Sequence, residues 1–201
     1  MKKLIFIGDD LSLGKNGYGE LVRSHLLLLE PGSENEVIFF SDNEMTYEKA
    51  FSQLPLHVIG KAPEVVVLAL GHHDLVIRGS LEDMVNPLTE TINLILDKTQ
   101  ASVLVVNLCS PFFVGNEQVY ARCKDFNRVC AEISNNNRVC QVDIDTPAEE
   151  FLSEHRLSKG EKMSLHAEGP RLTILGALLI SRTVAEKISM TFSPETGNRS
   201  N

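Results

Sequence analysis

The sequence lacks any long hydrophobic run. No stretch approaches the ~18 consecutive apolar residues that a membrane-spanning helix requires. The short apolar segment Leu4–Ile7 near the N-terminus is also too brief for a secretion signal, and Gly8 and two aspartates follow it at once. We therefore expect a cytoplasmic protein with no membrane partner.

Basic residues are outnumbered by acidic ones. The chain has 19 Lys and Arg against 27 Asp and Glu, which gives a formal net charge of -8. An acidic surface repels phosphate backbones, so a nucleic-acid partner is not expected. The glycine-rich stretch 14–19 has neither Walker nor Rossmann spacing, which leaves no motif for a nucleotide, and we expect no cofactor.

Cysteines are few, and their spacing is not that of a metal site. None of the four stands in a C-x-x-C pair; they are Cys109, Cys123, Cys130 and Cys140. In a chain without a secretion signal the thiols are expected to stay reduced. We interpret them as small buried hydrophobic groups.

The chain contains enough apolar material for one domain. It has 201 residues, of which 43% are hydrophobic, and no internal repeat or low-complexity block. We predict a single domain over residues 1–191. The remaining segment, 192–201, is rich in Ser, Pro, Gly and Asn and is predicted to be a disordered tail.

Short β-rich apolar runs alternate with longer segments of helical periodicity. The predicted strands are Leu4–Ile7, Val37–Phe40, Val65–Leu70, Val103–Leu108 and Val139–Ile144. The predicted helices cover residues 81–96, with Ser80 as N-cap and a bend at Pro87, residues 116–134 and residues 172–188. Nearly continuous apolar strands are typical of a sheet covered on both faces. The alternation predicts an α/β fold with a doubly wound parallel sheet of about five strands and right-handed crossovers.

Chemistry in such a sheet is expected beyond the carboxyl ends of the strands. Polar residues gather there: Asp9, Asp10 and Ser12 after the first strand, Asp42 and Asn43 after the second, and His72, His73 and Asp74 after the third. Glu168 and Arg171 come before the last predicted helix, and His166 lies just upstream. These residues are our candidate binding or catalytic set.

Three of these segments resemble the motifs of the SGNH (GDSL-type) esterase and lipase family. Gly8-Asp9-Asp10-Leu11 stands where the family has Gly-Asp-Ser-Leu, and Gly71-His72-His73-Asp74 where it has Gly-x-Asn-Asp. The segment 168–176 is similar to its last block, Asp-Gly-x-His-Leu-Thr-x-x-Gly. The resemblance covers nearly the whole chain and implies a three-layer α/β/α sandwich of the flavodoxin-like, SGNH-hydrolase type.

The family's catalytic positions are nevertheless substituted. By the resemblance, the nucleophilic serine falls on Asp10, the oxyanion-hole asparagine on His73, and the acid and base on Glu168 and Arg171. The second-block glycine falls near Asp42 or Asn43, where the sequence has no glycine. The matching framework residues are Gly8, Asp9, Leu11, Gly71, Asp74, Gly169 and Gly176.

These substitutions are incompatible with serine acyl transfer, which needs a hydroxyl, a base and oxyanion donors. Asp10 has no hydroxyl, and Arg171 keeps its proton at any working pH. Because an aspartate and an arginine can pair in bidentate fashion, we predict a salt-bridge chain of Asp10, Arg171 and Glu168 in place of a triad. The sequence therefore predicts a pseudoenzyme that binds an unidentified small molecule or protein, in an oligomeric state that the sequence does not define.

Four other interpretations remain open. Asp10 could simply cap the first helix, with Arg171 a surface residue in the first turn of the last helix. His166 could occupy the position of the family histidine. A hydrolase could instead use Asp10 as a carboxylate nucleophile with His73 as base. Finally, Asp9, Asp10, His72, His73 and Asp74 are suitable ligand types for a metal, although Arg171 nearby would repel a cation, and we expect no metal.

Overall fold

The protein is described here by a computed structural model. The described residues are 2–13, 17–42, 44–113, 115–134, 137–154, 165–167 and 171–192, without the side chains of Asp10, His166, Ala167, Arg171 and Phe192. The predicted tail lies outside them, apart from the backbone of Phe192. Within the described residues, no helix is both long and apolar enough to cross a membrane.

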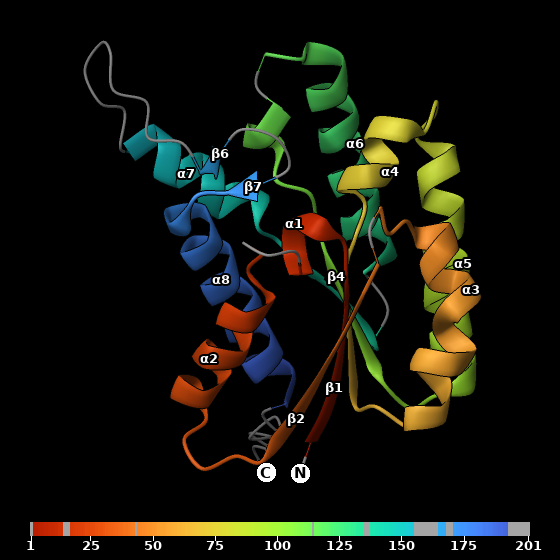
Figure 1. The fold of residues 1–201 in the computed structure, drawn as a ribbon. Helices are drawn as coiled ribbons and strands as arrows, with labels where there is room; N and C mark the ends of the chain where they lie inside the picture. The colour runs from red at the N-terminus through yellow and green to blue at the C-terminus, as the bar shows by residue number, and fades with distance from the viewer. Residues whose placement is uncertain are drawn as a thin grey trace, which may run out of the picture.

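A five-stranded parallel sheet forms the centre of the molecule (Figure 1), in the order β2-β1-β3-β4-β5. The strands are β1 (Lys2–Gly8), β2 (Asn35–Ser41), β3 (Val65–Ala69), β4 (Ser102–Val106) and β5 (Val139–Val142). All five predicted strands are confirmed. Every residue of β3 is buried, because helices cover both faces of the sheet, and this explains its unbroken apolar sequence.

Helices form a layer on each face, so the predicted three-layer α/β/α architecture is confirmed (Figure 1). One layer contains α2 (Gly19–Leu29), α7 (Asp145–Glu154) and α8 (Ile174–Phe192), whose apolar side chains share one core with the sheet. The other contains α3 (Tyr47–His57), α4 (His72–Ile77), α5 (Glu82–Lys98) and α6 (Glu117–Ile133), which form the second core. The remaining short elements are α1 (Asp10–Leu13), η1 (Ile59–Lys61), η2 (Ser110–Phe113), β6 (His166–Ala167) and β7 (Arg171–Leu172).

Side-chain caps fix where the predicted helices begin. Ser80 Oγ accepts the backbone N–H of Asp83 at 3.2 Å, and the Asp83 carboxylate accepts the Ser80 N–H at 3.2 Å. This reciprocal pair has the form of a capping box, but it lies one residue ahead of Leu81, which is the N-cap residue of α5. Pro87 lies inside that helix. At α6, the Asn116 side chain accepts the backbone N–H of Val119.

The start of the last helix differs from the prediction. Residues 171 and 172 form the short strand β7, which pairs antiparallel with β6, and α8 begins only at Ile174. Thr173 Oγ1 accepts the backbone N–H of Gly176 at 3.1 Å and so caps the helix. The interpretation that places Arg171 in the first turn of this helix is therefore wrong, because the threonine cap lies two residues further along.

Candidate functional site

The loops that carry most of the candidate residues meet at the carboxyl edge of the sheet. Gly8 at the end of β1 pairs in register with Ala69 at the end of β3 and with Ser41 at the end of β2. Helices α1 and α4 begin directly beyond β1 and β3, and η2 begins beyond β4. Parallel strand order therefore brings together residues that are far apart in sequence.

Asp10 occupies the first position of α1, two residues after β1 ends. The backbone N–H of Asp9 donates to the carbonyl of Ala69 at 3.3 Å, and that of Leu13 donates to the carbonyl of Asp9 at 2.8 Å. These bonds fold the chain sharply between strand and helix. The backbone of Asp10 thus lies at the turn where the family resemblance places the nucleophile, while its side chain is outside the described residues.

The nearest serine points into the protein. Ser12 is 1% exposed, and its Oγ lies 3.0 Å from the carbonyl oxygen of Ala69 and 3.0 Å from that of Asp9. Its backbone N–H donates to Asp9 Oδ1 at 3.2 Å. A side chain at Gly8 would overlap this hydroxyl, so the glycine allows the close approach. Ser12 therefore stabilises the turn, and its hydroxyl faces backbone carbonyls.

An aspartate and a histidine form an ionisable pair beyond the ends of β1 and β3. His72 Nδ1 lies 3.6 Å from Asp9 Oδ2, and the two side chains are 17% and 4% exposed. The rings of Phe112 and Phe113 flank the imidazole, each with its centroid 6.0 Å away. Asp9 Oδ2 and His72 Nε2 are buried without a hydrogen-bond partner among the described residues. The sequence resemblance pointed to His73, whereas the structure places His72 against Asp9.

Asp74 lies below this edge and faces helix α3. It is 0% exposed, and its Oδ2 accepts the backbone N–H of Tyr47 at 3.2 Å. Burial raises the pKa of this carboxyl to about 6, against the lowering effects of the Tyr47 bond and of Arg78. Gly71 precedes α4 with φ of 115°, a conformation that favours glycine. Asp74 and Gly71 therefore shape the framework around the candidate site.

The remaining candidates are described only in part. Asp42 is exposed and its carbonyl accepts the N–H of Met45 at 3.2 Å, whereas Asn43 lies outside the described residues. Glu168 also lies outside them, and only the backbones of His166 and Arg171 are described. The salt-bridge chain of Asp10, Arg171 and Glu168 therefore stays a prediction, as does the alternative that uses His166.

A polar cluster between η2, α6 and α7 is not among the candidates identified from the sequence. Lys124 Nζ donates to Asp145 Oδ2 and to Glu149 Oε1, at 2.7 Å each. Tyr120 Oη donates to Glu149 Oε1 at 3.0 Å, and the backbone N–H of Ser110 donates to Asp145 Oδ1 at 2.7 Å. Burial would lower the pKa of Lys124, but its bonds to the two carboxylates outweigh burial and raise it. The four-residue spacing of Asp145 and Glu149 on one helix was its only sequence signal.

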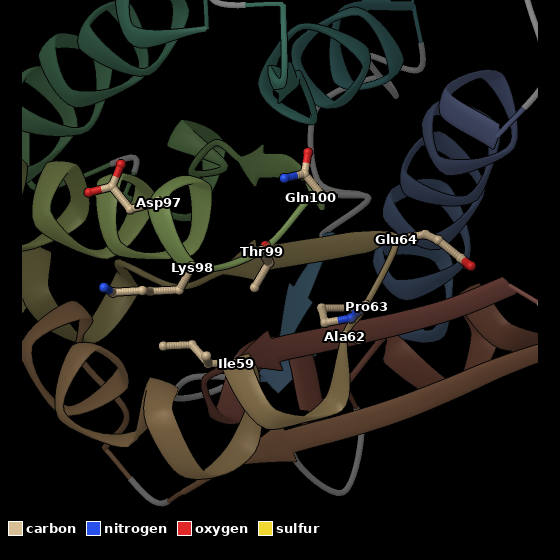
Figure 2. A pocket seen from close by; sticks show the side chains of 8 residues that line it. All are labelled: Ile59, Ala62, Pro63, Glu64, Asp97, Lys98, Thr99 and Gln100. Atoms are coloured by element: carbon tan, nitrogen blue, oxygen red, sulfur yellow. The ribbon is translucent and has the colours of Figure 1, made fainter.

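A separate hollow of about 470 Å³ lies at the opposite edge, beside the amino ends of β3 and β4 (Figure 2). Its lining comes from the segments 59–64 and 97–100. No described side chain in this lining has a buried polar atom without a hydrogen-bond partner. The hollow therefore gives no sign of a specific ligand.

The described residues also contain no cluster of three or more His, Cys, Asp or Glu side chains able to hold a metal ion. Cys109, Cys123 and Cys130 are buried free thiols, and Cys140 is half-buried. Burial raises the pKa of Cys130 to about 12, which keeps that thiol protonated. The three buried thiols thus pack as small hydrophobic groups, in agreement with the interpretation of the sequence.

Solved structures share this architecture at low sequence identity. Axe2, an acetylxylan esterase from Geobacillus stearothermophilus, superposes with a TM-score of 0.78 at 16% identity, covering 93% of this chain and 94% of that one. A protein from Parabacteroides merdae described as a GDSL-like lipase gives 0.74 at 11% identity, covering 94% and 96%. No protein-family model and no curated protein sequence matches this chain. The five-stranded sheet, its helical layers and these neighbours together show that the chain has the fold of the SGNH, or GDSL-type, hydrolases.

Proposed function

We propose that this chain is a non-hydrolytic SGNH-fold protein that binds a ligand at the carboxyl edge of its sheet. The observation that carries the proposal is the residue at the start of α1, where Asp10 follows the end of β1. An aspartate there supplies no hydroxyl for acyl transfer, and its negative charge opposes a developing oxyanion.

The surroundings of Asp10 offer no substitute for the missing serine in the part of the chain that the structure describes. The Ser12 hydroxyl is buried against the carbonyls of Asp9 and Ala69, and moving it outward would break the turn. Arg171, at the position matched to the family base, holds its proton at any working pH. Loss of nucleophile and base together supports binding without turnover.

A hydrolase with rebuilt machinery is the second candidate, and one observation favours it. Asp9 and His72 form a buried carboxylate–imidazole pair of the kind that performs acid–base catalysis. Such an enzyme would attack through Asp10, with His72 or the predicted His73 as base, or through a metal. It requires an open pocket over Asp10, whereas the binding protein is expected to have Arg171 filling that space.

Ester turnover separates the two candidates. Purified protein is assayed with p-nitrophenyl acetate beside an Asp10→Ala variant prepared in the same way. We expect both proteins to match the uncatalysed rate. Robust hydrolysis by the natural sequence that disappears in Asp10→Ala would overturn the proposal and assign the reaction to this carboxylate.

Restoring the family residues tests whether the cleft persists. The variant combines Asp10→Ser, His73→Asn, Glu168→Asp and Arg171→His, and its matched control carries the last three changes without Asp10→Ser. Serine-dependent gain of p-nitrophenyl acetate hydrolysis over the control would show that the scaffold still admits an acyl ligand. It would also identify the position of Asp10 with that of the family nucleophile.

A further inference from the structure

Two buried polar atoms at the carboxyl edge have no hydrogen-bond partner in the part of the chain that the structure describes. Asp9 is almost fully buried, and its Oδ1 accepts the backbone N–H of Ser12. Its Oδ2 has no hydrogen-bond partner among the described residues. The same holds for His72 Nε2. Buried polar atoms without partners cost about 1–3 kcal/mol each, so a bound group that pairs with them gains affinity.

The neighbouring carboxylate determines what kind of group can pair with His72. Asp9 Oδ2 faces Nδ1 at 3.6 Å, which favours a proton on that nitrogen over the opposite one. Nε2 of the neutral imidazole is then a hydrogen-bond acceptor. It therefore pairs with a ligand atom that donates a proton, such as a hydroxyl.

Two phenylalanine rings beside His72 favour an apolar group next to the hydroxyl of the ligand. Phe112 and Phe113 are consecutive residues of η2, both are half-buried, and each ring centroid lies 6.0 Å from that of the His72 imidazole. The N–H of Ser110 anchors this turn to Asp145 on α7. The His72 side chain is 17% exposed, while its Nε2 atom is buried.

We infer that His72, oriented by Asp9, is the binding residue for a small uncharged ligand that carries a hydroxyl on an apolar or aromatic group. The hydroxyl donates to Nε2, and the apolar group packs on Phe112 and Phe113. An anionic ligand is disfavoured, because its carboxylate or phosphate would approach the Asp9 carboxylate in a chain of net charge -8. This inference rests on the proposed function, since it names the ligand class of a site that binds without turnover.

Benzyl alcohol and benzoate form a matched pair of probes, because they share the ring and differ in donor and charge. Each is titrated into the full-length protein while the imidazole nitrogens are followed by two-bond ¹H–¹⁵N NMR. We expect a saturable shift of His72 Nε2 with benzyl alcohol and none with benzoate at equal concentration. An equal or larger shift with benzoate, or no saturable shift with benzyl alcohol, would refute the inference.

A histidine outside the candidate set provides the control. His72→Gln is expected to weaken benzyl alcohol binding more than tenfold, followed through backbone amide shifts. His57→Gln, at the end of α3 where the ring stacks on Phe40, is expected to change it less than twofold. Binding that survives His72→Gln contradicts the assignment. Should His72→Gln fail to fold, the spectrum of the natural protein decides the question, since a proton on Nε2 instead of Nδ1 also refutes it. Ester turnover would remove the proposed function without affecting these shifts, so the two failures are distinguishable.

Discussion

The backbone N–H of Ser110 and the carboxylate of Asp145 join two loops at the carboxyl edge, over 2.7 Å. The bond links the turn after β4 to the first residue of α7, 35 positions along the chain. Lys124 from α6 reaches the other oxygen of the same carboxylate. The Asp145 carboxylate therefore connects η2, α6 and α7.

Removing the cation of this cluster is expected to destabilise the fold. Lys124→Met keeps the apolar stem but leaves Asp145, only 7% exposed, without its charged partner. We expect the free energy of unfolding to fall by roughly 1–3 kcal/mol, measured by urea denaturation. Arg128→Met is the control, because its partners Asp125 and Glu132 are exposed and such pairs contribute about 0.5 kcal/mol or less. Equal losses in the two variants would contradict this role of Lys124.

A side chain at Gly176 is expected to disrupt the packing of α8. A Cβ there would overlap the backbone carbonyl of Leu165, which cannot rotate away as a side chain could. Gly176→Ala should lower the free energy of unfolding by about 1–3 kcal/mol or more. Gly60→Ala is the matched control, because nothing lies within 4 Å of its Cβ, and it should be neutral or slightly stabilising. Thermal unfolding of both variants checks this.

The buried Asp74 predicts a pH dependence of definite sign. Its pKa is about 6 in the folded protein against the ordinary aspartate value of 3.8, so the folded state binds the proton more tightly than the unfolded chain. Its ionisation therefore destabilises the fold above pH 6, and protonation relieves this as the pH falls toward 4. Asp74→Asn removes the titration while keeping an oxygen for the N–H of Tyr47.

Urea denaturation of both proteins at pH 7.5 and pH 4.5 measures the effect. The stability of the natural protein relative to Asp74→Asn should rise by roughly 1–3 kcal/mol at the lower pH. A difference that is constant across this range, or one that falls with acid, would show that the carboxyl titrates at its ordinary value.

Arg138 is expected to hold the end of α5. Its guanidinium donates to the carbonyl of Thr99 at 2.7 Å and of Ala101 at 2.9 Å, beyond the last turn of that helix. Arg138→Ala should cost about 1–3 kcal/mol and speed amide exchange around residues 98–101. Arg182→Ala, on an exposed helix face, should change neither quantity. Unchanged exchange in Arg138→Ala would rule out the capping role.

Much of the fold follows from local pattern, and the exceptions have physical causes. Strands such as Val65–Ala69 are recognisable because burial on both faces demands an unbroken apolar sequence. The two-residue strands β6 and β7 are too short to show such a pattern, and their antiparallel pairing of His166 with Leu172 forms only in the folded chain. Helix α8 begins two residues later than predicted because Thr173 caps it, and the periodicity of apolar residues does not reveal a cap.

The candidate site was also predictable only in part from the sequence. The sequence by itself determined the sheet, the edge at which polar residues gather, and the presence of aspartate at the family's serine position, because residue type and order are sufficient for these. Only the tertiary structure decided that His72 faces Asp9 and that Ser12 points inward. Successive residues of a helix turn by about 100°, so one histidine of an adjacent pair faces the site, and the sequence does not say which.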